Sequence, residues 1–157
     1  MREDSHFAFR LPALAGVFFL IIGISAETGG GKSMIDFNQY QWKNRLLLFF
    51  APQGDEPAFK TLKAEIGAQA EGAQERDLLI GEVLEQGASY FAGIPIDPQS
   101  ADDLRRRFSV REGRFTVLLI GKDGGLKMRK ENPTALAEIF TLIDSMPMRR
   151  QEMQERK

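Results

Sequence analysis

Five consecutive apolar residues, Leu46–Phe50, end at the turn-forming sequence Pro52–Gly54, and an amphipathic segment follows at once. An apolar run bounded by Pro and Gly is typical of a strand that is buried on both faces and leads into a helix. The helix is expected to begin at Pro57, with Asp55 or Glu56 as its cap. In α/β folds the carboxyl end of such a strand often carries a functional site. The apolar residues of the expected helix fall on one face: Phe59, Leu62 and Ile66.

Further apolar runs predict more strands and helices. Strands are expected at residues 78–84, 115–120 and 126–129, and the Gly-rich turn between the last two makes them a hairpin. A helix over residues 101–108 is expected to begin with a capping box formed by Ser100 and Asp103. A final helix is expected to begin at the cap residue Asn132, with Pro133 in the first helical position. The residues of its buried face recur at helical spacing: Leu136, Ile139, Phe140 and Ile143.

Two stretches between these elements hold apolar side chains without a regular pattern. Residues 85–99 are interrupted by two glycines and two prolines, which predicts an irregular loop. Its apolar side chains form either a binding surface or the cover of a core edge. The aromatic residues before the first strand are expected to pack on the core, with a ligand platform as the alternative. They are Phe37, Tyr40 and Trp42.

The amino-terminal residues have the pattern of an export signal. Leu11–Ile24 is almost unbroken apolar sequence after Arg10, and Ser25-Ala26 is a small-residue cleavage site. We therefore expect export to the periplasm or the extracellular space. An uncleaved anchor is the alternative, although about 14 apolar residues fall short of the roughly 20 that span a bilayer. The chain is divided into a signal peptide (1–26), a Gly-rich linker (27–36), one folded domain (37–148) and a charged tail (149–157).

Residues 26–33, Ala-Glu-Thr-Gly-Gly-Gly-Lys-Ser, match a nucleotide-binding phosphate loop. In such a loop Lys32 would bind the terminal phosphates and Ser33 a magnesium ion. The context argues against this function, because cleavage after Ala26 would cut the motif. The later strand candidates also end in Glu85 and Gly121 rather than in a magnesium-binding aspartate. A Gly-rich linker is the preferred interpretation.

Composition narrows the possible chemistry. The 157-residue chain has a formal net charge of −1, so no global field attracts nucleic acid or an acidic membrane. It contains no cysteine, and its single histidine, His6, lies in the predicted signal peptide. Thiol catalysis, disulfides and thiolate metal sites are therefore excluded, and the cleaved chain would lack an imidazole. We assign no catalytic residue, no metal ligand and no cofactor.

Charged residues gather in two places that invite a functional interpretation. Arg105–Arg107 are consecutive, so they fan around their helix at about 100° per residue. Together with Arg111 and Arg114 they form either a solvated cluster or the seat of an anionic ligand. Four carboxylates offer general acid–base groups, but their spacing forms no recognisable catalytic pair. They are Asp55, Glu56, Asp102 and Asp103.

The order of the expected elements resembles that of the thioredoxin fold. Phe49–Pro52 resembles the approach to the thioredoxin redox loop, Leu104–Val110 the segment before its cis-proline loop, and Phe115–Gly124 its hairpin. The resemblance implies an α/β fold with a central mixed four-stranded sheet (β-α-β-α-β-β-α) flanked by helices. The chain departs from thioredoxins where Gln53–Pro57 replaces the two cysteines and Arg114-Phe115 replaces the cis-proline. Because disulfide exchange requires a thiolate, no thioredoxin residue transfers as catalytic.

Residues 35–153 resemble more closely a family of small secreted bacterial proteins, domain of unknown function 4174. That family is in turn similar to the cysteine-poor, thioredoxin-like module of sushi-repeat and other extracellular matrix proteins. Residues 40–45, 76–78, 115–125 and 143–153 carry the likeness, and the last segment is the most specific. The resemblance supports the fold and export but implies no activity.

Together these patterns predict an exported, non-catalytic, monomeric thioredoxin-like domain that binds an unknown protein or small ligand. No nucleic acid, and no membrane beyond the leader, is expected as a partner. A hydrolase using carboxylate and arginine groups is one alternative, and a nucleotide-binding loop protein is the other. The candidate binding surface consists of Pro52, Gln53, Asp55, Glu56, Tyr90, Phe91, Arg114 and Phe115.

Overall fold

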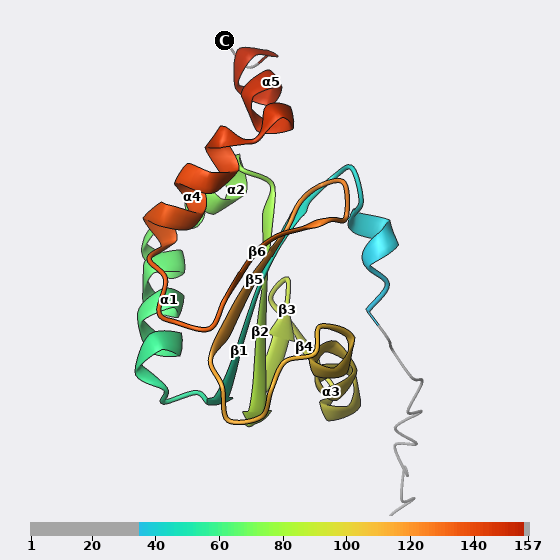
Figure 1. The fold of residues 1–157 in the computed structure, drawn as a ribbon, viewed down its shortest axis with the longest axis vertical. Helices are drawn as coiled ribbons and strands as arrows, with labels where there is room; N and C mark the ends of the chain where they lie inside the picture. Colours follow the sequence, from blue (N-terminus) through green and yellow to red (C-terminus); the bar gives the residue numbers. More distant parts are fainter. Residues whose placement is uncertain (1–34, 156–157) are drawn as a thin grey trace, which may run out of the picture.

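The computed structural model describes residues 35–155 (Figure 1), so the predicted signal peptide, the phosphate-loop match and most of the linker lie outside the described residues. Six strands of the described chain form one mixed sheet in the order β4-β3-β2-β1-β5-β6. The strands are β1 (Arg45–Gln53), β2 (Leu78–Gln86), β3 (Ser89–Phe91), β4 (Ile94–Ile96), β5 (Thr116–Ile120) and β6 (Leu126–Lys130). The helices are η1 (Phe37–Tyr40), α1 (Pro57–Ala68), α2 (Ala70–Glu75), α3 (Pro98–Arg107), α4 (Leu136–Ser145) and α5 (Pro147–Glu155).

Strand β1 lies in the middle of the sheet, parallel to β2 and antiparallel to β5. Its residues Leu47–Ala51 are completely buried, because strands flank them on both sides and helices cover both faces. Alternate side chains enter two separate cores. Leu47 and Phe49 pack beneath α1 and α4, whereas Leu48 and Phe50 pack beneath α3 and η1. The predicted central strand and the mixed α/β class are confirmed.

The sheet has two more strands than the predicted four, because residues 85–99 are not an irregular loop. β2 continues to Gln86, and β3 and β4 form a hairpin at the edge of the sheet. Pro95 of β4 pairs with Tyr90 of β3. An edge strand tolerates proline because only one of its sides donates to the ladder, so the proline did not exclude a strand.

Two helix starts differ from the prediction. Asp97, and not Ser100, caps α3: its Oδ1 accepts a 2.9 Å hydrogen bond from the Ser100 backbone N–H. Helix α4 begins at Leu136 rather than at Asn132, and the Leu136 N–H donates to Glu65 Oε2 of α1 at 2.6 Å. A carboxylate distant in sequence thus satisfies a helix-end donor, which local cap patterns do not predict.

The first helix agrees more closely with its pattern. It begins at Pro57 as predicted, although its cap residue Glu56 makes no side-chain hydrogen bond there. Its predicted apolar face is confirmed, with Phe59 and Leu62 buried and Ile66 packed beside them.

The charged tail expected at residues 149–157 is helical in the part that the structure describes. Residues 147–155 form helix α5, and the Arg149 side chain is fully buried. Ion pairs with charged side chains from other elements hold α5 in place. None of the helices in residues 35–155 has the length and apolar character needed to cross a bilayer.

The predicted aromatic lid is only partly correct. Phe37 is buried and Tyr40 is half-buried against the α3-side core, whereas Trp42 is 63% exposed. Trp42 has a φ of 65°, and its backbone N–H donates to the Lys122 oxygen at 2.6 Å. The turn therefore directs this side chain toward solvent instead of the core.

Candidate functional site

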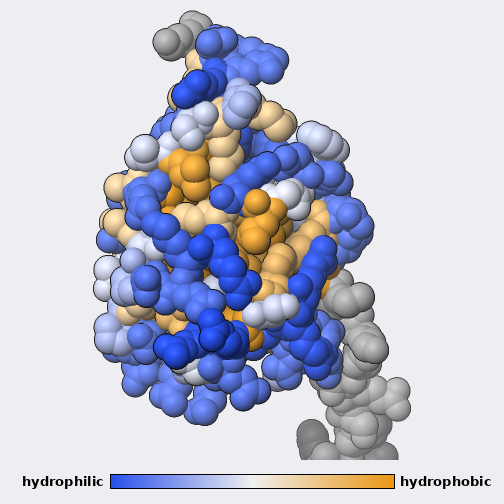
Figure 2. Space-filling view, in the orientation of Figure 1, coloured by the Kyte–Doolittle hydropathy of each residue, from blue (hydrophilic) through white to orange (hydrophobic). Residues whose placement is uncertain are grey.

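The carboxyl end of β1 brings four of the predicted site residues together. Gln53 and Asp55 are exposed, whereas Pro52 and Glu56 are half-buried at the turn into α1. Gln53 lies beside the end of β2, where its Nε2 donates to Gln86 Oε1 at 3.3 Å. Hydrophilic residues cover this lower end of the molecule in Figure 2, below the ends of β1 and β2 in Figure 1.

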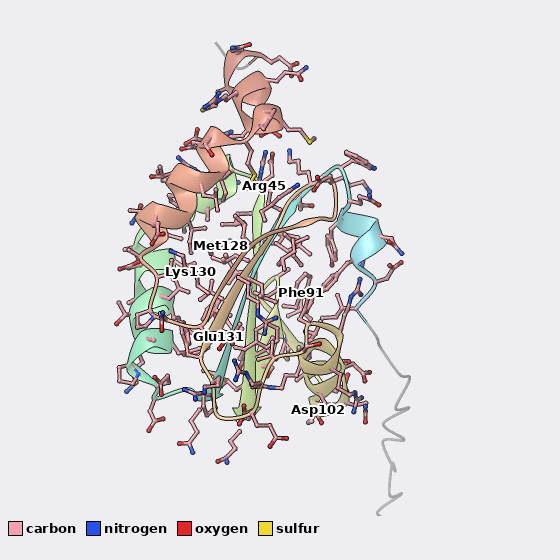
Figure 3. All side chains as sticks on the ribbon, in the orientation of Figure 1. Arg45, Phe91, Asp102, Met128, Lys130 and Glu131 are labelled. Atoms are coloured by element: carbon pink, nitrogen blue, oxygen red, sulfur yellow. The ribbon has the colours of Figure 1, made fainter. Side chains whose placement is uncertain are left out.

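The other predicted residues divide between surface and core. Arg114 is exposed just before β5, and β5 begins opposite Phe50 near the same end of β1. Phe115 is buried in the core beneath α1 and α4. Phe91 is buried on the opposite, α3 side of the sheet (Figure 3). Neither phenylalanine can therefore offer a binding surface.

Tyr90 lies on a different face from its neighbour Phe91, because successive strand residues point to opposite faces. It pairs with Glu82 on β2 and is half-buried. The Lys63 ammonium of α1 lies 5.9 Å from the centre of the Tyr90 ring. Tyr90 thus belongs to the flank beside α1, and the predicted aromatic patch of residues 90–91 is split across the sheet.

A buried arginine, Arg105, organises the carboxyl end. Its guanidinium donates to the backbone oxygens of Ala51 and Val83 at 2.8 and 3.1 Å. It also donates to Glu85 Oε1 at 3.0 Å, and the same carboxylate oxygen accepts the Gly113 backbone N–H at 2.9 Å. Arg105 therefore ties α3, both central strands and the segment before β5 into one unit.

Burial lowers the pKa of the Arg105 guanidinium, and the nearby Glu85, Asp102 and Glu112 carboxylates oppose that shift. The group nevertheless remains a cation, since arginine is effectively always protonated in proteins. Its ionic partner Glu85 is one-fifth exposed at the surface. Arg105 and Glu85 are thus a supporting pair beneath the exposed turn.

The sequence interpretation of Arg105–Arg107 as a solvated cluster or an anion seat fails for Arg105. Arg106 is exposed and bonds to Asp103, one turn back on α3. Arg107 instead stacks on the Phe37 ring, 4.6 Å from its centre. The three arginines point to three different environments, and the helical position of Arg105 next to buried Leu104 is the signal that could have identified it.

A shallow hollow of about 330 Å³ lies beside this pair, between the end of β2 and the start of α3. Leu84, Ile96 and Pro98 supply apolar walls, and Glu85 and Asp102 supply carboxylates. Figure 3 places Asp102 and Glu131 at this end of the sheet, far from Arg45. The hollow and the exposed turn lie at the same end of the sheet, where both present hydrogen-bonding and charged groups.

The carboxylates suggested for acid–base chemistry come from two elements. Asp55 and Glu56 precede α1, whereas Asp102 and Asp103 lie on α3, with Asp103 bonded to Arg106. Within residues 35–155, no group of three or more His, Asp or Glu side chains is arranged to hold a metal ion. The structure therefore divides the suggested acid–base groups between the turn before α1 and helix α3.

Comparison with known proteins agrees with this geometry. A model of the family described as "Domain of unknown function (DUF4174)" matches residues 36–152. The chain is 33% identical over 139 residues to coiled-coil domain-containing protein 80 of Danio rerio, a match that covers 78% of this chain and 16% of that protein. It is 22% identical to sushi repeat-containing protein SRPX2 of Xenopus laevis, over 87% of this chain and 30% of that protein. The chain thus spans less than a third of either relative.

Solved structures with the same fold are thioredoxin-fold peroxiredoxins. A reduced 2-Cys peroxiredoxin of Plasmodium vivax superposes with a TM-score of 0.58 at 12% identity, covering 73% of this chain and 71% of that one. Thioredoxin peroxidase I of Plasmodium yoelii gives a TM-score of 0.54 at 16% identity, over 73% and 79% of the two chains. At such identities the likeness shows the fold alone, and the predicted thioredoxin-like fold is confirmed.

Proposed function

The chain belongs to the DUF4174 family, and we propose that it is an exported thioredoxin-like module that binds a protein partner without thiol chemistry. Binding takes place at the carboxyl-end surface, which we define as Gln53, Asp55, Glu56, Arg114 and the hollow beside Glu85. The function rests on one observation: the buried Arg105–Glu85 pair braces an exposed polar turn at the place where a redox loop would need its cysteines.

Preorganisation supports binding at this surface. A surface whose backbone is already held in place loses less conformational entropy when a partner binds. Arg105 supplies that support through Ala51 and Val83, directly before the exposed turn. The absence of cysteine from the whole sequence removes the thiolate that peroxidase or disulfide-exchange chemistry requires.

Export has support of a different kind. The apolar segment 11–24 and the small residues Ser25-Ala26 have the pattern of a cleavable leader. The similarity to a sushi repeat-containing protein is consistent with a place outside the cytoplasm. Sequencing the amino terminus of the mature chain tests cleavage of this leader: a start near Glu27 supports it, and an intact Met1 contradicts it.

Site-specific photocrosslinking in the exporting cell tests the binding surface. A photoreactive amino acid at Gln53 should give a discrete crosslinked species, whereas the same group at exposed Gln151 on α5 should not. The crosslink at position 53 should be lost when Asp55→Lys and Arg114→Glu reverse two surface charges. Equal crosslinking from both positions, or none from position 53, would contradict the proposal.

A further inference from the structure

A separate recess lies at the opposite end of the sheet, on its α3 side. It has a volume of about 200 Å³ and is enclosed by η1, the end of α3 and the β5–β6 turn. Drug-sized ligands occupy pockets of roughly 300–1,000 Å³, so this recess is suited to a smaller molecule. The residues that determine its chemistry are Phe37, Tyr40, Arg107, Phe108, Ile120 and Asp123.

Arg107 gives the recess a positive charge that no carboxylate of residues 35–155 neutralises through an ion pair. Its guanidinium carbon lies 4.6 Å from the centre of the Phe37 ring and 5.8 Å from that of Phe108. Cation–π attraction to these rings positions the guanidinium without using its N–H donors. The N–H donors of arginine match the geometry of a carboxylate, which accepts two parallel hydrogen bonds from them.

The environment of Arg107 differs from that of its neighbours along α3. Arg105 is engaged by Glu85 and backbone oxygens, and Arg106 is engaged by Asp103. Arg107 alone among these three lines the recess. An exposed, stacked arginine at the mouth of a hollow is a preorganised anion receptor.

The opposite wall carries a carboxylate that already has its own partners. Asp123 Oδ2 accepts from Lys127 Nζ at 2.6 Å, and its Oδ1 accepts the Gly125 N–H at 3.0 Å. The hydrogen bond from Lys127 is the main cause that holds the pKa of the Asp123 carboxyl below its usual value, so the group stays ionised. Because this carboxylate is paired with Lys127, it does not compete with a ligand for Arg107.

The remaining walls are mixed. Leu46 and Ile120 come from the sheet, and Tyr40 and Phe108 from the two covering helices. The polar residues Asn38, Gln41 and Asn44 also line the recess. A hydrophobic body placed against the apolar residues would lose its contact with water and gain the free energy of apolar burial. The recess thus combines the guanidinium of Arg107 with both apolar and polar lining residues.

We propose that this recess binds a small apolar monocarboxylate, with the carboxylate on Arg107 and the hydrophobic body against Tyr40, Phe108 and Ile120. The site is distinct from the carboxyl-end surface of the proposed function, and it requires no partner protein. A monocarboxylate supplies one planar acceptor group for Arg107 and leaves its hydrophobic body to contact the apolar residues.

Titration of the purified chain with phenylacetate, followed by calorimetry and by the fluorescence of the single tryptophan Trp42, tests the proposal. We expect saturable binding that is at least about tenfold weaker in Arg107→Gln, since a charge-assisted hydrogen bond is lost. Arg106→Gln is the matched control on the same helix, and its affinity should equal that of the unaltered chain. Uncharged phenylacetamide should bind at least about tenfold more weakly than phenylacetate.

Three results would overturn the assignment. They are the absence of saturable phenylacetate binding, equal affinities in Arg107→Gln and the unaltered chain, and tighter binding of inorganic phosphate than of phenylacetate. Melting temperatures of both variants show whether they remain folded, and Arg107→Lys provides a second variant that retains the charge. Because Lys lacks the planar fork, its affinity should fall between those of the unaltered chain and Arg107→Gln.

Discussion

An arginine is buried near each end of the central strand β1, and the two arginines stabilise different contacts. At the amino end, Arg45 is 1% exposed and forms a two-pronged ion pair with Glu152 of α5, at 3.2 and 3.1 Å. At the carboxyl end, Arg105 binds one side chain, Glu85, and two backbone oxygens. Arg45 therefore fastens a helix to the sheet, whereas Arg105 supports the strands themselves.

The amino-end network extends well beyond that pair. Lys122 bonds to both Glu152 and Asp77, at 2.9 and 2.8 Å. Arg149 bonds to Glu75 and Asp144, at 2.6 and 3.2 Å. The network thus joins α5 to β1, to the end of α2, to α4 and to the β5–β6 turn. Most of its charged groups are paired with one another.

The carboxyl end is less closed. Outside the Arg105–Glu85 pair, Gln53, Asp55 and Arg114 face solvent there. Exposed polar groups over a rigid support are available to a partner, whereas mutually paired charges are not. The contrast explains why the proposed binding surface lies at the carboxyl end while the amino end serves chiefly to hold the fold together.

Removing Glu152 should give the largest effect, because it leaves the buried Arg45 charge without its partner. Glu152→Ala is expected to lower the free energy of unfolding by about 3–5 kcal/mol. Urea denaturation followed by circular dichroism measures this. Glu155→Ala is the control on the same exposed helix end, where a change of at most about 0.5 kcal/mol is expected. A loss below 1 kcal/mol in Glu152→Ala would show that α5 is not fastened by this pair.

Removing Arg105 should have a smaller effect, since Glu85 is partly exposed and keeps its bond from Gly113. Arg105→Ala is expected to cost about 2–3 kcal/mol through the hydrogen bonds it loses. The same denaturation experiment measures it, with Arg106→Ala as the control on the adjacent exposed position. If Arg105→Ala destabilised the protein more than Glu152→Ala, the ranking of the two ends would be reversed.

Lowering the pH should destabilise the contacts at the amino end of β1, because Glu152 becomes protonated. Burial raises the pKa of its carboxyl, but hydrogen bonds from Arg45 and Lys122 outweigh burial and leave the pKa below the ordinary value of 4.5. A carboxyl whose pKa is lower in the folded state stabilises the fold above its unfolded pKa, and this contribution is lost as pH falls through the folded pKa. Stability should therefore decline as the pH is lowered from about 5 to 3.

Melting temperatures across that pH range test the origin of the decline. Glu152→Gln cannot titrate at this position, so its melting temperature should fall less steeply with acid than that of the unaltered chain. Asp123 and Asp97 also have lowered carboxyl pKa values, and they contribute equally to both curves. Identical slopes in the two proteins would remove Glu152 as the acid-sensitive group.

The elements that the sequence predicted well are those with strong local signals. The apolar run of β1, the Gly-rich turn of the β5–β6 hairpin and the spaced apolar face of α4 all reflect residues close together in the chain. The β3–β4 hairpin was missed because Pro95 argues against a strand until its edge position is known. Two candidate site residues, Phe91 and Phe115, proved to be core residues, since burial depends on which elements cover them.

The amino-acid sequence by itself determined the α/β class, the absence of thiol chemistry and the order of the main elements, because hydrophobic period and composition act locally. Tertiary structure alone decided that α5 packs as a helix and that Arg45, Arg105 and Arg149 are buried. Arg45 and Arg105 have ion-pair partners 107 and 20 residues away along the chain, and Arg149 pairs with Glu75, 74 residues away, as well as with nearby Asp144. From the local sequence alone, a charged side chain is expected to face solvent. Only the fold shows which opposite charge compensates for the hydration that the side chain loses when it is buried.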